Sequence, residues 1–152
     1  MHSEGAKYEH ALTNIEVNEL SKIFKVKNYV GCVADNTIPY LDNKQCCIVN
    51  YQSDYEGGTH WTSLRRYGKY LIHYDSLGFP VDEPIIKYAK KFVLTILTKQ
   101  IRIQQDGSYY CGHHSIYFLK IVNTPEDINK YYDNFDKSLK NNDLKISNIF
   151  DI

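Results

Sequence analysis

Residues 60–75 read HWTSLRRYGKYLIHYD, and this stretch decides the fold. Two runs rich in aromatic and β-branched residues lie on either side of Gly68, which predicts two strands joined by a tight hairpin. His60 stands 8 residues before Gly68, and Asp75 stands 7 residues after it. Because hairpin strands are antiparallel, His60 and Asp75 should lie side by side at one edge of the sheet.

Outside this hairpin, the rest of the chain adds two more strands and several helices. Thr13 and Glu16 form a capping box in front of a helix over about 14–26. That helix has its apolar positions at Ile15, Leu20, Ile23 and Phe24, and residues 28–41 are rich in turn formers and should be irregular. Strands are expected over 45–51, 60–67, 69–75 and 101–105. Three further helices are expected. The first starts at Asp82 or Glu83, with Pro84 in its first turn, and its apolar face reaches Leu97. The second starts near Cys111, and the third starts at Thr124 with Pro125 at N1. One or two short helices end the chain.

This order predicts an α+β fold with a small central mixed or antiparallel sheet flanked by helices. The chain has 152 residues, 43% of them hydrophobic and 24% charged, which fits one soluble domain over 1–152. Residues 1–12 are expected to be a flexible tail. The apolar stretches are too short for a signal peptide or a membrane span. We therefore expect a monomer with no membrane association.

Charge and cysteine content argue against an obligatory nucleic-acid partner and against a metal site. The chain has 18 basic and 18 acidic residues, whereas proteins that depend on nucleic acid usually carry a basic excess. There is no Cys-x-x-Cys pair among Cys32, Cys46, Cys47 and Cys111, and the adjacent Cys46 and Cys47 would point to opposite faces of a strand. A zinc site is therefore not expected, nor is any other metal or cofactor. Reduced thiols in an intracellular compartment are the simplest interpretation.

Cys111 is the strongest candidate for a nucleophile. It follows a loop that contains Gly107 and precedes Gly112, at the predicted first turn of an apolar helix. A helix N-terminus favours the thiolate and offers N–H donors to an oxyanion. Taken alone, however, a free cysteine is more often a buried structural residue.

A cysteine nucleophile needs a base, and His60 is the best-placed histidine. It follows Gly57 and Gly58 closely, and Trp61 comes next. Small residues let a substrate backbone approach, and an indole can fix the imidazole ring. Gly57, Gly58, Trp61 and Gly112 are therefore expected to contact substrate. Taken alone, His60 could equally be a strand-end histidine beside an aromatic residue.

The other histidines, His2, His10, His73, His113 and His114, fit the role of base less well. His2 and His10 lie in or beside the tail, and His73 can cap a face of the sheet. His113 and His114 belong to the Cys111 helix, and a pair so close on one helix leaves little room for a substrate carbonyl.

Asp75 and Gln105 complete the candidate set. A carboxylate at the end of the second hairpin strand can accept the Nδ1–H of His60 and leave Nε2 for the thiol. Gln105 precedes the loop to Cys111, and its amide can donate to a developing oxyanion. Gln104 points the other way, so only one of the two can serve. Asp75 alone could simply start a turn, and it is the joint arrangement that favours catalysis.

Three segments resemble the adenovirus maturation protease (adenain) family and the wider clan of ubiquitin-like-protein proteases. They are GGTHW at 57–61, YDSLGF at 74–79 and QDGSYYCG at 105–112. The chain order His, acid, Gln, Cys-Gly is that of the clan and is opposite to that of papain-like enzymes. The resemblance covers roughly residues 13–122, including 31–39 and 46–50.

The resemblance implies papain-like catalytic geometry with permuted connectivity, in which His60, Asp75 and Cys111 form a triad and Gln105 donates to the oxyanion. It also implies cleavage next to small residues such as glycine. The short chain is most similar to proteases of virophages and Polinton-like elements, which implies capsid precursor substrates and a place in the virion and the host-cell cytoplasm.

The sequence departs from the adenain family at two points. Adenain is activated by DNA and by a disulfide-linked peptide, but 91–103 contains no cysteine and the net charge is zero, so neither activator is indicated. The interval from Gln105 to Cys111 is six residues, as in the ubiquitin-like-protein proteases. The adenovirus interval of seven would select Gln104 instead.

Two alternatives stay open. One is an isopeptidase that removes ubiquitin-like modifiers from host proteins. The other is a non-catalytic capsid or DNA-binding component that has kept the fold.

Overall fold

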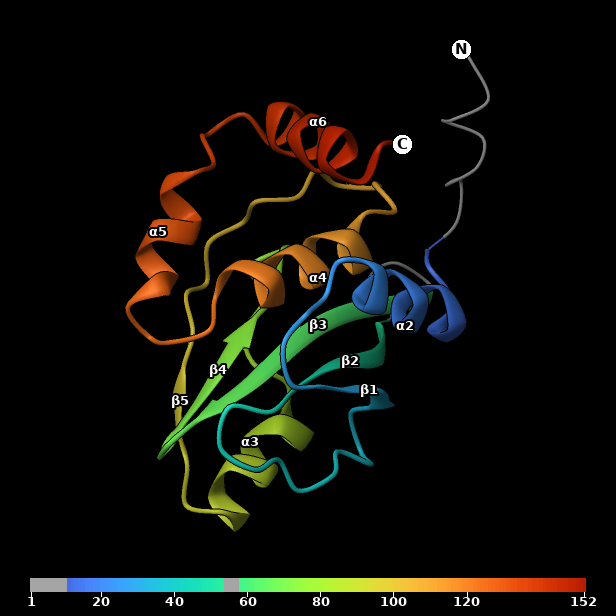
Figure 1. Ribbon diagram of the computed structural model, residues 1–152. Coiled ribbons are helices and arrows are strands. Elements are labelled where there is room, and N and C mark those ends of the chain that lie inside the picture. The colour runs from blue at the N-terminus through green and yellow to red at the C-terminus, as the bar shows by residue number, and fades with distance from the viewer. Residues whose placement is uncertain (1–10, 54–57) are drawn as a thin grey trace.

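The computed structural model describes residues 11–53 and 58–152, and a five-stranded sheet runs through its middle (Figure 1). The strands are β1 Tyr29–Ala34, β2 Cys46–Ser53, β3 Gly58–Tyr67, β4 Tyr70–Tyr74 and β5 Thr95–Leu97, and they lie side by side in chain order. β2, β3 and β4 are antiparallel, whereas β1 with β2 and β4 with β5 form parallel pairs at the two edges. The predicted α+β class with a mixed sheet is confirmed.

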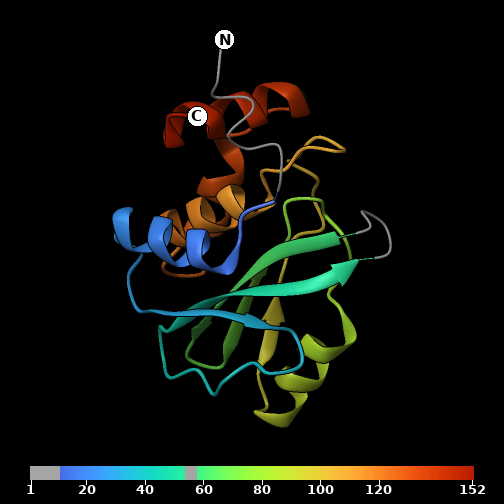
Figure 2. The same ribbon diagram turned by 90° about the vertical axis from the view of Figure 1, so that its right-hand side faces the viewer.

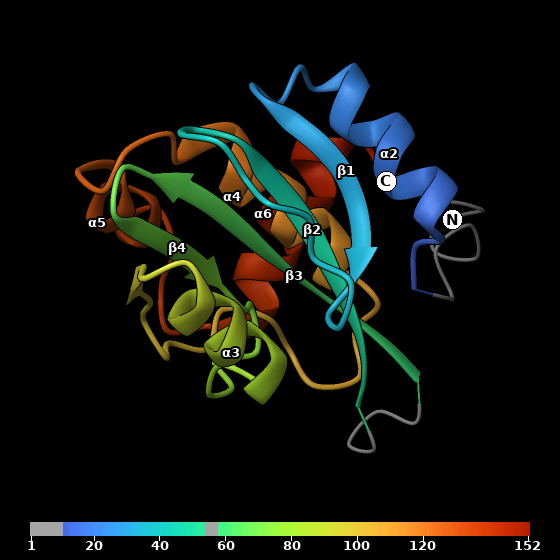
Figure 3. The ribbon, with the colours of Figure 1, turned by 90° about the horizontal axis from the view of Figure 1, so that it is seen from below.

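Within the described residues, five helices cover both faces of this sheet. They are α2 Asn14–Ile23, α3 Glu83–Lys91, α4 Cys111–Ile121, α5 Asp127–Asp133 and α6 Leu139–Phe150. α4 crosses β3 on one face with α2, α5 and α6 around it, and α3 covers the opposite face (Figures 1 and 3). Figure 2 shows the resulting layers from the side. None of the helices in the described ranges has the length and apolar character needed to cross a bilayer.

Two buried clusters explain why β2 is apolar on both sides. Cys46 and Ile48 pack toward α4, whereas Cys47 and Val49 pack toward α3. Successive side chains of a strand point to opposite faces, so a sheet covered on both faces needs a continuous apolar run. The prediction that Cys46 and Cys47 point to opposite faces is confirmed, and both are free thiols.

The hairpin predicted around Gly68 is present. β3 and β4 pair from Ser63 with Tyr74 to Tyr67 with Tyr70. Gly68 has a φ of +59° in the turn, a conformation that glycine adopts without steric cost.

Arg65 of β3 is buried and binds the far end of α4. Its Nε and Nη2 donate to the carbonyls of Val122 and Leu119, both at 3.0 Å. Its Nη1 donates to the carbonyls of Lys27 and Lys44. The last carbonyls of a helix lack intrahelical partners and carry partial negative charge, so the guanidinium caps α4 at its C-terminus.

The N-terminal helix starts as predicted, but only part of its predicted apolar face meets the core. Both capping-box bonds between Thr13 and Glu16 are present, at 2.9 and 3.2 Å. Ile15 and Ile23 are 65% and 68% exposed, however, whereas Val17 is buried. α2 ends at Ile23, earlier than expected, and the predicted apolar residues Leu20 and Phe24 pack against the core beside Val17.

The prediction of a flexible tail over 1–12 is wrong for Leu12. Residues 1–10 lie outside the described residues, but Leu12 is buried in the core and its carbonyl accepts a 2.8 Å bond from Trp61 Nε1.

Two further sequence predictions were wrong at the sheet edges. Residues 28–41 were expected to be irregular, yet they contain β1. Its pairing shifts register between Tyr29 and Cys32, where Gly31 has a φ of +129°, so the strand lacks regular alternation. Residues 101–105 form no strand. The last strand is instead β5, which the sequence placed on a helical face.

The helices after the sheet have different bounds from those predicted. α3 ends at Lys91, because Val93 takes a positive φ of 55° and turns the chain toward β5. α5 begins at Asp127, three residues after the predicted cap Thr124. The Asp127 carboxylate accepts the N–H of Thr124 at 3.1 Å, which makes a separate turn in front of the helix. The expected C-terminal helices are confirmed as α5 and α6.

Candidate active site

His60 and Asp75 meet just beyond the end of the β3–β4 pairing. His60 Nε2 lies 2.8 Å from Asp75 Oδ1, and both residues are buried. The same Asp75 oxygen accepts the N–H of Leu77 at 2.8 Å, so the carboxylate is held in place by its own turn. The predicted contact between the two strand ends is therefore confirmed.

The ring nitrogen that contacts the acid is not the predicted one. From the sequence we expected Nδ1 to bind Asp75 and Nε2 to face the thiol, whereas Nε2 binds Asp75 in the structure. Nδ1 is therefore the nitrogen left for Cys111. Strand pairing fixes which residues meet, but side-chain torsions decide the ring orientation, and the sequence does not reveal them.

Gly78 allows the turn after Asp75 to form. Its φ is +72°, and a Cβ there would lie 2.9 Å from the backbone nitrogen of Arg102. Only glycine combines this conformation with so close an approach. The turn thus brings 101–104 beside Asp75, where Ser76 O accepts the N–H groups of Ile103 and Gln104 at 2.8 and 3.0 Å.

Cys111 is the first residue of α4 and is buried. Its position beside first-turn N–H groups is as predicted, and these groups lack intrahelical acceptors. Ser115, one turn later, donates to the carbonyls of Cys111 and Trp61 at 2.8 and 3.1 Å. One hydroxyl therefore ties the helix that carries Cys111 to the strand that carries His60.

His60 is held as an imidazolium at neutral pH. Burial lowers its pKa, but hydrogen bonds to Asp75 and to the Cys111 thiol, together with their charges, outweigh burial and raise the pKa to about 10. An imidazole between a carboxylate and a thiol is the arrangement that activates a sulfur nucleophile.

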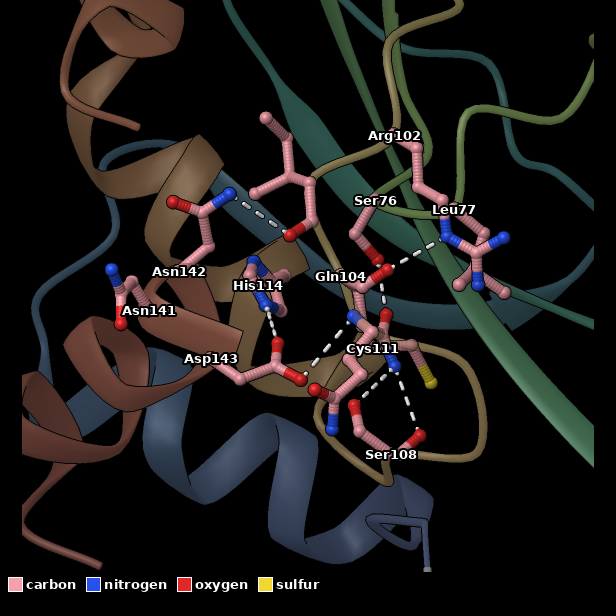
Figure 4. Close-up of polar contacts among 12 residues, drawn as sticks. Ser76, Leu77, Arg102, Gln104, Ser108, Cys111, His114, Asn141, Asn142 and Asp143 are labelled. Atoms are coloured by element: carbon pink, nitrogen blue, oxygen red, sulfur yellow. Dashed lines mark hydrogen bonds and ion pairs between the residues drawn. The ribbon is translucent and has the colours of Figure 1, made fainter. Parts of the chain in front are cut away.

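The structure exchanges the expected roles of the two glutamines. Gln105 was predicted to reach the oxyanion, but its side chain is exposed, whereas that of Gln104 is buried. Gln104 Oε1 accepts from Ser76 Oγ at 2.5 Å, and Nε2 donates to the carbonyl and the hydroxyl of Ser108, both at 2.9 Å. Figure 4 shows the Gln104 side chain directed toward Ser108 and Cys111. Because 101–105 is not a strand, its alternation could not indicate which amide points inward.

The four residues predicted to contact substrate differ in their surroundings. Gly57 lies outside the described residues, and Gly58 begins β3. At Gly112 an added Cβ would lie 2.9 Å from Leu12 Cδ1 and 3.2 Å from Trp61 Cδ1, so this glycine is needed for packing. Trp61 is buried as well, but it also lines a surface pocket of about 560 Å³. Trp61 therefore borders space that a substrate could occupy.

The remaining histidines lie outside the Cys111–His60 contact. His2 and His10 are not among the described residues. Burial lowers the pKa of His73 to about 4, and its Nδ1 lies 2.9 Å from Thr98 Oγ1. Burial likewise lowers the pKa of His113 to about 3. Both rings are therefore neutral near pH 7.

Sequence reasoning missed a second histidine–carboxylate pair beside the site. His114 Nε2 lies 2.9 Å from Asp143 Oδ1, and both residues are buried. The two are 29 residues apart and belong to different helices, so no local sequence signal connects them. Ser76 and Ser108 were missed too, although both lie in the segments quoted above for the resemblance.

No protein-family model matches this chain, and no curated protein matches it. Within the described residues, no group of three or more His, Cys, Asp and Glu side chains is arranged to hold a metal ion. The chemistry that can be assigned therefore depends on the geometry of the Cys111 site.

Proposed function

We propose that this chain is a cysteine endopeptidase in which Cys111 is the nucleophile and His60 the base. One observation carries the proposal: the buried His60 ring bonds to Asp75 through Nε2 and contacts the Cys111 thiol at the start of α4. A thiol, a base and an orienting acid in this relation are what nucleophilic catalysis requires. The papain-like geometry with permuted connectivity that the resemblance implies belongs to this proposal.

The reaction needs only these groups and water. The proton that Cys111 gives up is already held on His60 before substrate binds, and the sulfur attacks the scissile carbonyl carbon to form an S–C bond. The oxyanion receives N–H groups from the Cys111 backbone and a neighbouring amide. His60 then protonates the leaving amine as the C–N bond breaks. Water, deprotonated by His60, hydrolyses the thioester and restores the thiol.

Gln104 replaces Gln105 as the proposed side-chain donor to the oxyanion. Its amide is buried and fixed by Ser76, which limits its motion. Because Nε2 already contacts Ser108 through two bonds, donation to an oxyanion requires one N–H to exchange partner. Substrate binding near 105–110 would supply that exchange.

The proposed substrates are capsid or other structural precursor proteins cut next to small residues during virion maturation. This part of the proposal is supported by the sequence resemblance to adenain-type and virophage-type proteases alone. Small residues before His60 in the chain, Gly57 and Gly58, are consistent with a substrate backbone passing close by.

Thiol reactivity gives the first test. Burial raises the pKa of Cys46 to about 11 and also raises the pKa values of Cys32 and Cys47. An alkylating reagent near pH 7 should therefore label Cys111 first, and His60→Ala should slow that labelling. Equal labelling of all four thiols would favour a non-catalytic component.

Cleavage gives the second test. The chain is incubated with glycine-containing capsid precursor peptides and, in parallel, with a conjugate of a Gly-Gly-terminated modifier. We expect cleavage of the precursor peptides, abolished by Cys111→Ala. Rapid cleavage of the conjugate with untouched precursors would select the isopeptidase alternative, and undiminished cleavage by Cys111→Ala would exclude this site.

A further inference from the structure

Two side chains of helix α6 form hydrogen bonds with the backbone of the segment that carries Gln104. Asn142 Nδ2 donates to the carbonyl of Ile103 at 3.2 Å, and Asp143 Oδ2 accepts the backbone N–H of Gln105 at 3.3 Å. These two contacts hold the residues directly before and after Gln104 in the chain, and Figure 4 shows Asn142 and Asp143 beside this segment. Asn142 and Asp143 are buried, and the Asn142 contact is buried with them, whereas the contact to Gln105 is partly buried.

Asp143 also holds the helix that carries Cys111. Its other oxygen, Oδ1, lies 2.9 Å from Nε2 of His114, which follows Cys111 by one turn of α4. A single carboxylate therefore joins the nucleophile helix to the residue next to the proposed oxyanion donor. The relative position of Cys111 and Gln104 depends on this bridge.

His114 and Asp143 form a fixed hydrogen-bonded bridge and do not relay a proton. Burial lowers the pKa of His114, so its ring is neutral near pH 7. A carboxylate only accepts hydrogen bonds, so the single ring proton sits on Nε2 and points at Asp143. The bridge is complete before any substrate arrives.

We propose that Asp143, assisted by Asn142, is a positioning residue that sets the Gln104 amide at the distance from Cys111 that oxyanion stabilisation needs. This inference rests on the proposed endopeptidase function. Misplacing a catalytic group by about 1 Å can cost about 100-fold in rate. Loss of the bridge should therefore impair the step in which negative charge develops, with little effect on the activation of the thiol by His60.

The variants Asp143→Asn and Asn142→Ala test the proposal. Asparagine has nearly the shape of aspartate, but its NH₂ group would face the N–H of either His114 or Gln105. The matched control is Asn141→Ala, because Asn141 is the exposed neighbour on the same helix. Each protein is compared by kcat and KM on a cleaved peptide, by the alkylation rate of Cys111, and by its melting temperature.

We expect Asp143→Asn to lower kcat by about 10- to 100-fold. KM and the alkylation rate of Cys111 should stay within about twofold of wild type. Asn142→Ala should lower kcat by a smaller factor, again with KM and the alkylation rate nearly unchanged. Asn141→Ala should match wild type in all three.

Two results would overturn the positioning role. One is unchanged kcat in folded Asp143→Asn and Asn142→Ala proteins. The other is an equal fall of cleavage and alkylation, which would indicate general loss of structure. Cleavage by a Cys111→Ala protein would instead overturn the endopeptidase proposal itself, so the two failures can be told apart.

Discussion

Two buried histidine–carboxylate pairs lie close together in this protein, and they behave in opposite ways. His60 with Asp75 and His114 with Asp143 have the same Nε2 to Oδ1 contact, at 2.8 and 2.9 Å. The pKa of His60 is nevertheless raised to about 10, whereas the pKa of His114 is lowered. Burial opposes the charged ring in both cases.

The difference comes from the second ring nitrogen. His60 has a further hydrogen-bonding and charge partner in the Cys111 thiol, whereas His114 Nδ1 is buried without a hydrogen-bond partner. One carboxylate therefore does not suffice to keep a buried imidazole charged. A histidine next to an acid indicates a catalytic base only when a nucleophile faces its other side.

The largest expected contrast between the pairs is in cleavage rate. Asp75→Asn should lower kcat/KM by about 10²- to 10⁴-fold and leave a small residual activity, because general acid–base catalysis contributes that much. Asp143→Asn should cost no more than about 100-fold. Steady-state kinetics on one peptide substrate measures both, and an equal loss in the two variants would remove the distinction drawn here.

The charge state of His60 should depend on the thiol. Cys111→Ala removes one of the groups that raise the pKa of His60, so that pKa should fall below about 10. His114 should be unaffected. Titration of the imidazole resonances by NMR measures both, and an unchanged His60 pKa in the variant would show that Asp75 alone accounts for the shift.

Removing the His114 ring should lower the free energy of unfolding and leave the alkylation rate of Cys111 nearly unchanged. His114→Leu leaves the buried Asp143 oxygen without its donor, which should cost about 1–3 kcal/mol in unfolding free energy. Asn141→Ala is the control and should change stability by less than about 0.5 kcal/mol. Urea denaturation compares the two, and no loss in His114→Leu would argue against the bridge.

The pairs should also limit stability at opposite ends of the pH range. A raised pKa means that the folded state binds the extra proton, so the contribution of His60 is full below about pH 6.5 and is lost as pH rises toward about 10. The lowered pKa of His114 acts in the other direction, and its contribution is lost as pH falls below about 6.5.

Melting curves across this pH range should therefore separate the two pairs. Cys111→Ala should reduce the fall in melting temperature as the pH becomes alkaline. His114→Leu should reduce part of the fall in melting temperature at acid pH, where His73 and His113 also contribute. Identical profiles for both variants would contradict the assignment.

The sequence predicts the parts of this site that depend on local patterns. Gly68 between two apolar runs indicates the hairpin, and the hairpin brings His60 to Asp75. Cys111 could be placed at a helix start because glycines precede and follow it. These features need only strand alternation, turn chemistry and helix capping.

The rest depends on contacts between distant segments. The choice between Gln104 and Gln105 stayed open in the sequence because 101–105 follows the turn at Gly78 and not a strand ladder. Asp143 reaches the site from a helix near the end of the chain. β1 was missed because its glycine and irregular register hide the alternation on which strand prediction depends.

The cap on α4 has a mechanical consequence. Arg65 holds the last carbonyls of the helix, and Ser115 holds its first turn against Trp61, so β3 anchors the helix at both ends. Sliding or rocking of α4 against the sheet would break all of these bonds together. We therefore expect α4 to keep its position when a polypeptide reaches the sulfur, so that any rearrangement falls on the segments that connect the helices and strands.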